Sequence, residues 1–232
     1  MTKNELAGKN PLKVFAIAAD GSQVDRRMGL VISRAGLGKT ALLVQIALDS
    51  ILSGRQVLHV SINQSLDKTR VWYEDIIKDV AGDDAAGIMD QVNRNRLIMT
   101  FKEASFTRPK LEERLNDLVY QNIFRPTVVL VDGFTFDDSS AQSLADLKEL
   151  AGVMGLNIWF TAVSHREDER KSAAGTPAPC HEVDDIFDTV LLIEADGVGG
   201  ELALNAIKDT IGSVSPGKVL KLDPATYLVK GT

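Results

Sequence analysis

The chain has 232 residues, of which 44% are hydrophobic and 25% are charged, a composition typical of globular proteins. Its formal net charge of −6 at pH 7 excludes a general electrostatic attraction to nucleic acid or to anionic membranes. The single cysteine, Cys180, excludes an internal disulfide and a zinc site built from several cysteines.

The first ten residues, MTKNELAGKN, are polar and lack the apolar core that a signal peptide needs. No apolar run reaches the roughly 18–20 residues that cross a bilayer. We therefore expect a cytoplasmic protein with no membrane contact. At this length we expect one domain over residues 1–232, in which residues 1–28 form an extension with one short strand, Val14–Ala18.

Short apolar runs recur along most of the chain, and stretches with apolar residues at helical spacing separate them. Such runs are typical of parallel strands that helices cover on both faces. The predicted strands are Val14–Ala18, Gly29–Ser33, Gln56–Ile62, Arg96–Phe101, Thr127–Val131 and Asn157–Val163. The predicted helices are Ala41–Leu52, Ser65–Val80, Asp83–Asn93, Lys110–Gln121 and Ser140–Met154. The predicted fold class is therefore α/β, a mostly parallel sheet with helices on both faces.

The last part of the chain differs, because short turns join its strand-like segments. Residues 165–182 first form a loop rich in charged and small residues, which we predict to be mobile. The turn sequences DGVGG and SVSPG then separate segments of strand character, which are 187–194, 201–208, 218–222 and 227–229. Connections this short predict antiparallel β-hairpins over residues 187–229.

The strongest functional motif follows the strand Gly29–Ser33. Residues 33–40 read SRAGLGKT, which matches the phosphate-binding pattern G-x-x-x-x-G-K-[ST] except that Ser33 replaces its first glycine. In such a P-loop the backbone N–H groups surround a phosphate, and the next helix adds its positive dipole end. Lys39 is predicted to reach the outer phosphates and Thr40 to bind Mg²⁺. The residues predicted to bind the nucleotide are Arg34, Ala35, Gly36, Leu37, Gly38, Lys39, Thr40 and Ala41.

A second signal is Asp132, which ends the apolar run of residues 125–131. An aspartate at the carboxyl end of a buried parallel strand lies beside the P-loop, where open α/β sheets bind their ligands. We predict that Asp132 holds a water of the Mg²⁺ shell. The alternative is that Asp132 only begins a turn. ATP and Mg²⁺ are thus the predicted cofactors.

The order of these motifs resembles that of the RecA-like P-loop ATPases, particularly the DnaB and KaiC branches. The resemblance covers roughly residues 28–229 and includes VLHVSINQSLDK, NIWFTAVSHRE and the closing segment KVLKLDPATYLV. It implies that Asn63 stands where the family carries the glutamate that activates the attacking water. It also implies that His165 takes the position of a γ-phosphate sensor, where many relatives have glutamine. Lys39, Asn63 and His165 are therefore the predicted catalytic positions.

The departure at Asn63 bears on the rate. An asparagine amide can hydrogen-bond a water but cannot accept its proton, and loss of a general base typically costs about 10²–10⁴-fold in rate. His165, or a carboxylate such as Asp67 or Glu74, could replace the glutamate, although the spacing favours none of them. We therefore expect slow hydrolysis.

The resemblance further implies a ring- or filament-type homo-oligomer in which Lys208 reaches a neighbouring subunit's nucleotide. The alternative is an exposed lysine on an edge strand. Acidic residues are interleaved with basic ones in the loop 165–182, so strong nucleic-acid binding is not expected. We predict a slow Mg²⁺-dependent ATPase with a regulatory or assembly role and a protein partner. The alternatives are a DNA-associated helicase- or recombinase-type ATPase and a small-molecule kinase on a P-loop fold.

Overall fold

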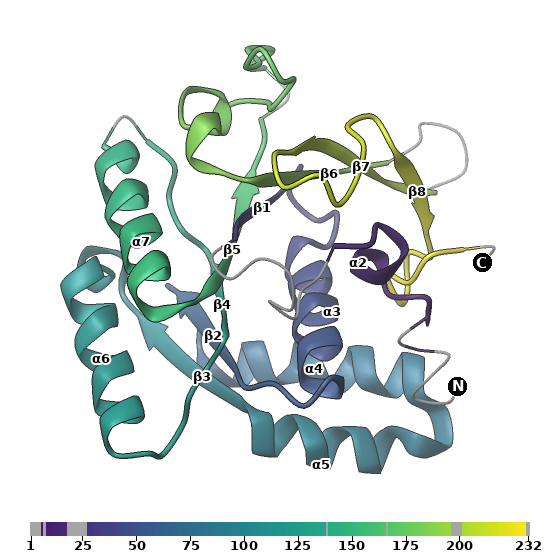
Figure 1. Cartoon of the computed structure of the whole chain (residues 1–232). Helices are drawn as coiled ribbons and strands as arrows, with labels where there is room; N and C mark the ends of the chain where they lie inside the picture. Colours follow the sequence, from purple (N-terminus) through teal and green to yellow (C-terminus); the bar gives the residue numbers. More distant parts are fainter. Residues whose placement is uncertain are drawn as a thin grey trace.

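The structure is a computed structural model that describes residues 6, 8–17, 27–137, 139–165, 167–195 and 201–230. Its centre is an eight-stranded sheet with the order β3-β2-β4-β5-β1-β6-β7-β8 (Figure 1). Strands β1 to β6 pair in parallel with one another, and β7 and β8 are antiparallel to their neighbours. The strands are β1 (Met28–Ser33), β2 (Val57–Ile62), β3 (Arg96–Phe101), β4 (Val128–Asp132), β5 (Asn157–Val163), β6 (Thr189–Ala195), β7 (Leu202–Asp209) and β8 (Val219–Leu222).

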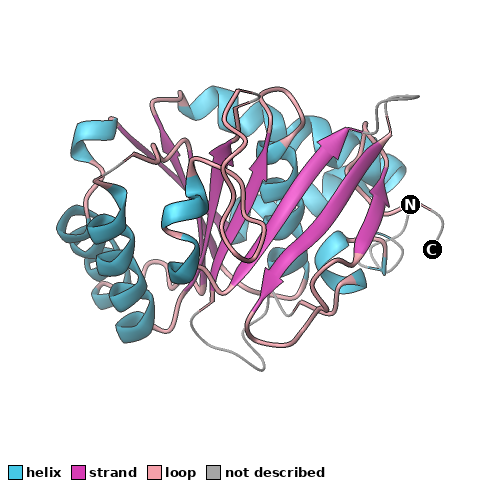
Figure 2. Ribbon diagram, turned by 90° about the horizontal axis from the view of Figure 1, so that it is seen from above, coloured by secondary structure: helices cyan, strands magenta, loops and turns pink. Residues whose placement is uncertain are grey.

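Helices lie on both sides of the sheet (Figures 1 and 2). One face carries α2 (Pro11–Val14), α3 (Lys39–Leu52), α4 (Leu66–Ala81) and α5 (Ala85–Asn95), and the other carries α6 (Arg108–Tyr120) and α7 (Ser140–Met154). Short 3₁₀ turns occupy Gly82–Asp84, Glu103–Ser105, Cys180–Glu182 and Asp184–Ile186. This arrangement confirms the predicted α/β class. Among the helices of the described residues, none combines the length and the apolar character needed to cross a membrane.

The buried strands explain why the sequence shows continuous apolar runs rather than alternation. All six residues of β1 are buried. Because successive side chains of a strand point to opposite faces, Val31 packs with the helices of one layer, and Leu30 and Ile32 with those of the other. Helix α3 is buried from Ala41 to Leu52, which accounts for its almost uniformly apolar sequence.

The prediction of a strand near the N-terminus is wrong. The strand expected at Val14–Ala18 does not form: Val14 ends α2, residues 15–17 follow as a turn, and Ala18 lies outside the described residues. Local chemistry explains the helix, because the Asn10 side chain accepts a hydrogen bond from the Leu12 N–H at 3.0 Å, and Pro11 occupies the first helical position. The apolar Phe15 and Ile17 are still buried, but a turn carries them.

The C-terminal region combines both kinds of pairing. The hairpins β6–β7 and β7–β8 confirm the antiparallel prediction, whereas β6 also pairs in parallel with β1. The long connection between β5 and β6 makes this parallel pairing feasible. The strand expected at 227–229 is reduced to an isolated bridge between Leu222 and Val229, and the DGVGG turn lies partly outside the described residues.

The loop predicted to be mobile packs against the domain over its second half. Lys171 forms a β-bridge with Pro177, and Thr176, Ala178 and Cys180 are buried. The Thr176 hydroxyl also donates to Asp184 Oδ1 at 2.6 Å. These contacts tie residues 171–182 to the segment that leads into β6.

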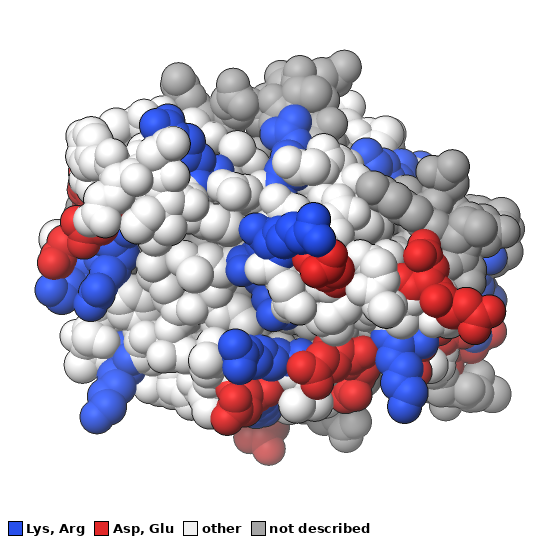
Figure 3. Space-filling view, turned by 90° about the horizontal axis from the view of Figure 1, so that it is seen from below, with Lys and Arg blue, Asp and Glu red and all other residues white. Residues whose placement is uncertain are grey.

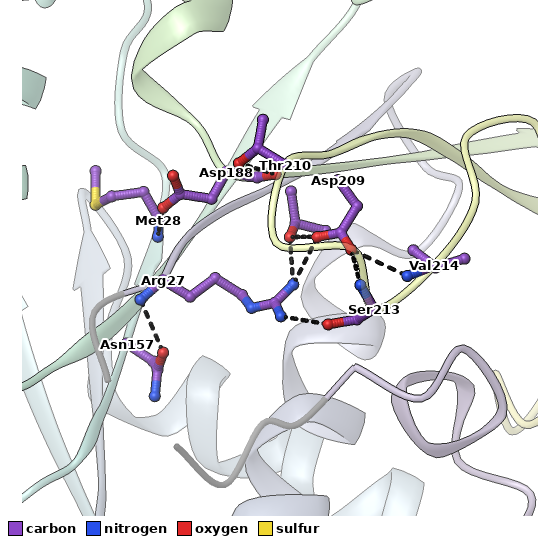
Figure 4. Close-up of polar contacts among 9 residues, drawn as sticks. Arg27, Met28, Asn157, Asp188, Asp209, Thr210, Ser213 and Val214 are labelled. Atoms are coloured by element: carbon purple, nitrogen blue, oxygen red, sulfur yellow. Dashed lines mark hydrogen bonds and ion pairs between the residues drawn. The ribbon is translucent and has the colours of Figure 1, made fainter. Parts of the chain in front are cut away.

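A buried polar cluster joins the start of β1 to the C-terminal strands (Figure 4). The Arg27 guanidinium donates to Asp209 Oδ1 at 3.0 Å and to Ser213 Oγ at 2.9 Å, and it also contacts the Thr189 hydroxyl. Only 1% of the Arg27 side chain and none of the Asp209 side chain is exposed. Asp209 in turn accepts the backbone N–H groups of Ser213 and Val214. The cluster therefore fixes β7 against the parallel core.

A buried histidine in β2 is expected to make stability depend on pH. His59 is fully buried, and its Nδ1 lies 3.0 Å from the Tyr73 hydroxyl. Burial is the main cause that lowers the pKa of His59 from its usual 6.5 to about 4. Between these values the unfolded chain binds a proton that the folded chain does not. Stability that is present above about pH 6.5 is thus lost as the pH falls, by up to about 1.4 kcal/mol per pH unit.

Urea unfolding at about pH 7, 5.5 and 4.5 measures this effect. The His59→Gln variant, which cannot titrate, should lose less stability between about pH 6.5 and 4.5 than the unmodified protein does. The His165→Gln variant is the matched control, because His165 is exposed and should leave the pH dependence unchanged. Equal slopes for all three proteins would contradict the role of His59.

Candidate functional site

The predicted P-loop joins the end of β1 to the start of α3. Gly36 and Gly38 have φ angles of +81° and +84°, a left-handed conformation that glycine adopts without steric cost. Ser33 needs no such freedom, because it is the last, buried residue of β1. No side chain caps the N-terminus of α3 in the described part of the chain. Its first N–H groups are therefore available to an anion.

Lys39 curls back over this loop. Its Nζ lies 3.1 Å from the carbonyl oxygen of Arg34, 3.4 Å from that of Ser33 and 3.3 Å from Ser33 Oγ. Burial lowers the pKa of the Lys39 ammonium, and the charge of Asp132 acts in the opposite direction. In the described residues this ammonium forms no ion pair, so its hydrogen-bond acceptors are neutral.

Asp132 collects side chains from several elements at the carboxyl ends of the parallel strands. Its Oδ2 accepts the Thr40 hydroxyl at 2.7 Å, and its Oδ1 accepts the Thr161 hydroxyl at 2.7 Å. The Gln64 amide, two residues beyond β2, lies 3.5 Å from Oδ2. The structure thus brings Thr40 and Asp132 together, as predicted. Thr161 and Gln64 were not predicted; the only signal for Thr161 is a polar residue inside the apolar run of β5.

The donors in this cluster fit Mg²⁺ if phosphate oxygens complete the coordination. Mg²⁺ prefers oxygen ligands and retains several waters, and the Thr40 hydroxyl and the Asp132 carboxylate supply such oxygens. Within the described residues, no group of three or more His, Cys, Asp or Glu side chains could hold a metal ion. A divalent ion here would therefore take its remaining ligands from water and a bound phosphate.

Asn63 follows β2 directly, but its side chain contacts a different turn. Its φ of +57° lies in the left-handed region, which asparagine enters more readily than most residues. Asn63 Oδ1 accepts the Glu103 N–H at 3.1 Å, and its amide donates to Glu103 Oε2 at 3.2 Å. The structure therefore connects Asn63 with the turn after β3, while its neighbour Gln64 points toward Asp132.

His165 lies next to the P-loop, at the edge of a cavity of about 560 Å³. The cavity walls come from the P-loop, from the segment after β5 and from the end of β6. They carry both signs of charge, from Arg34, Asp168, Glu169, Lys171 and Glu194. The structure thus brings His165 and Arg34 to one cavity, as their predicted roles require.

Lys208 is engaged within its own chain. Its Nζ donates to the carbonyl oxygen of Asp184 at 2.6 Å and lies 3.8 Å from Asp184 Oδ1, and only 16% of the side chain is exposed. Strand β7 lies between β6 and β8, so the alternative of an exposed lysine on an edge strand is wrong. The contact with Asp184 would have to break before Lys208 could reach a neighbouring subunit.

The closing aspartate–proline turn also belongs to this site, which the sequence did not predict. Tyr227 lies so close to Gly38 that a Cβ atom there would be 2.0 Å from the tyrosine Cζ and hydroxyl oxygen. Asp223 holds the turn by accepting the N–H groups of Ala225 and Thr226 at 2.8 and 3.1 Å. The Thr226 carbonyl accepts the side chain of Gln45 from α3. The turn is therefore docked on the helix that carries Lys39 and Thr40.

Comparison with protein-family models gives no match, and neither does comparison with curated proteins. Among solved structures, the chain is similar to the ATPase domain of a DnaB-like helicase. The TM-score is 0.67 with 14% sequence identity, and the match covers 90% of this chain and 86% of that chain. The fold is that of a RecA-like P-loop ATPase. At this identity, the RecA-like fold is what the similarity establishes, and the chemistry has to be argued from the residues of the site.

Proposed function

We propose that this RecA-like protein binds ATP at residues 33–41 and hydrolyses it slowly with Mg²⁺. The observation that carries the proposal is the 2.7 Å hydrogen bond between Thr40 and Asp132. It places a hydroxyl and a carboxylate at the start of α3, beside the Lys39 ammonium. Phosphates need donors and positive charge at this position, and Mg²⁺ needs hard oxygen ligands.

The residues of the loop suggest how the nucleotide would be held. Lys39 would exchange the neutral carbonyls of Ser33 and Arg34 for phosphate oxygens, and hydrogen bonds between charged groups are stronger than those to neutral ones. Thr161 fixes the Asp132 carboxylate from the other side, so that its second oxygen faces Thr40. Mg²⁺, when bound through Thr40 and a water on Asp132, supplies charge neutralisation at the phosphates.

The proposed rate is low because the residue that follows β2 is Asn63. An amide cannot accept the proton of the attacking water, and this amide is already bonded to Glu103. His165 remains our candidate for the residue that senses the γ-phosphate, since it lies at the cavity beside Arg34. Slow turnover suits a protein whose output is the state of its bound nucleotide.

The charge distribution favours a regulatory or assembly role over that of a DNA motor. Acidic and basic side chains are interspersed on the face shown in Figure 3. In the loop 165–182, Arg170 forms an ion pair of 2.6 Å with Asp168, which neutralises one of its basic side chains. Binding of a phosphate backbone requires a row of uncompensated basic groups. We therefore propose a protein partner, or further copies of this chain, as the target.

Replacing Lys39 by alanine tests the proposed site. We expect MgATP to bind about 10- to 100-fold more weakly, because a hydrogen bond to a charged group contributes roughly 1.5–3 kcal/mol. Titration with a fluorescent ATP analogue measures the affinity, and the same titration with GTP defines the choice of base. The Lys78→Ala variant is the matched control, since Lys78 is exposed on α4. Equal affinities for the Lys39→Ala variant and the unmodified protein would contradict the P-loop assignment.

A further inference from the structure

Gln64 is the polar side chain that reaches the nucleotide end of the site from β2. It is half-buried, and its Nε2 lies 3.5 Å from Asp132 Oδ2, the oxygen that also accepts the Thr40 hydroxyl. Strand β2 pairs directly with β4, so the residues that follow β2 lie beside Asp132 at the same edge of the sheet. Gln64 therefore enters the site from the side opposite to Thr161.

The contact that Gln64 makes with Asp132 is not needed to hold the carboxylate. Asp132 already accepts two hydrogen bonds of 2.7 Å, from Thr40 and Thr161, whereas 3.5 Å is the outer limit of a hydrogen bond. The Gln64 amide can therefore turn to another partner at little cost. Asn63, by contrast, is bonded through both of its amide atoms to Glu103.

We propose that Gln64, rather than Asn63, orients the water that attacks the γ-phosphate of bound ATP. The inference rests on the proposed function. The Gln64 carbonyl oxygen would accept a hydrogen bond from the water, and its N–H group would donate to a γ-phosphate oxygen. A glutamine amide can perform both tasks because it carries a donor and an acceptor on one rigid group. Orientation of the water by glutamine is an established means of phosphoryl transfer.

The step balances without a protein base. The water oxygen forms a bond to the γ-phosphorus, and the bond between that phosphorus and the bridging oxygen breaks. The bond's electron pair leaves with ADP, and the proton of the water passes to an oxygen of the departing phosphate. Gln64 gains and loses no proton, which agrees with the slow turnover proposed above.

Three variants separate Gln64 from its neighbour and from surface glutamines. We expect Gln64→Ala to lower kcat by about 10- to 100-fold and to leave KM and MgATP affinity within about twofold, because only the geometry of the water is lost. Gln142→Ala is the matched control, since Gln142 is exposed on α7 and bonds only Asp146. Asn63→Gly removes the other amide without strain at a left-handed position, and it should lower kcat less than Gln64→Ala does.

A second measurement does not depend on turnover. ADP with aluminium fluoride imitates the γ-phosphate and its attacking water, so the unmodified protein should bind ADP more tightly when aluminium fluoride is present. Gln64→Ala should lose most of this gain, whereas Gln142→Ala should keep it.

The outcomes distinguish the two levels of the proposal. Absence of MgATP binding by the unmodified protein, or binding that survives Lys39→Ala, would overturn the proposed function. Binding that requires Lys39 leaves that part of the function intact. In that case, the role of Gln64 is overturned if Gln64→Ala keeps both kcat and the fluoride gain. It is equally overturned if Asn63→Gly loses more activity than Gln64→Ala, or if the unmodified protein shows neither turnover nor a fluoride gain.

Discussion

Replacing Arg27 by alanine is expected to lower the free energy of unfolding by about 3–5 kcal/mol, because it leaves the buried carboxylate of Asp209 without its cationic partner. Both side chains are almost completely buried, and the guanidinium also binds Ser213 (Figure 4). Water cannot replace these contacts in the closed cluster. The loss should loosen β7 from the parallel core.

Urea unfolding followed by circular dichroism measures the Arg27 effect. The Arg94→Ala variant is the matched control, because Arg94 also pairs with an aspartate, Asp90, but both side chains are largely exposed. Exposed pairs contribute roughly 0–1 kcal/mol, so this variant should stay close to the unmodified protein. A similar small loss for Arg27→Ala would show that the buried pair is not needed to hold the C-terminal strands.

Replacing Gly38 by alanine is expected to weaken MgATP binding by about 100-fold or more, since small displacements within a site can have effects of this size. Two causes act together. The φ of +84° disfavours any side chain, and the new Cβ would lie 2.0 Å from the ring of Tyr227. Either the P-loop backbone moves or Tyr227 is displaced, and movement of the loop misaligns its N–H groups.

A double-mutant cycle separates these two causes. Tyr227→Ala combined with Gly38→Ala removes the collision and should recover part of the affinity. Gly36→Ala is the control for backbone strain alone, because Gly36 has a φ of +81° and a Cβ atom added there would meet no atom within 4 Å in the described part of the chain. No recovery in the double variant, together with an equal loss in Gly36→Ala, would contradict the role of the Tyr227 contact.

The parts of the fold that the sequence predicted well are those that local patterns determine. Buried parallel strands are recognisable as apolar runs, and the P-loop requires glycine at two left-handed positions within eight residues. The pairing of Thr40 with Asp132 was predictable because the carboxyl ends of parallel strands share one edge of a sheet. These features depend on chain direction and spacing alone.

The features that the sequence did not predict depend on where side chains point after folding. Asn63 and Gln64 are adjacent amides, and nothing local shows that one turns to Glu103 and the other to Asp132. Tyr227 reaches Gly38 only because β7 and β8 extend the sheet past α3. The capped helix at Pro11–Val14 resembles a strand in its apolar content, and the proline at its first position was the overlooked signal.

Helix α3 is held from both ends of the chain, which bears on how small a working nucleotide-binding unit can be. Asn10 donates to the backbone carbonyl of Gln45 at 2.8 Å, and the Gln45 side chain donates to Thr226. The Val229 N–H also donates to the Lys9 carbonyl at 2.9 Å, so the two segments meet over the helix. Trimming either segment would uncover the middle of α3 and loosen the support beneath Lys39. The smallest fragment able to hold a phosphate therefore spans nearly all of residues 9–229.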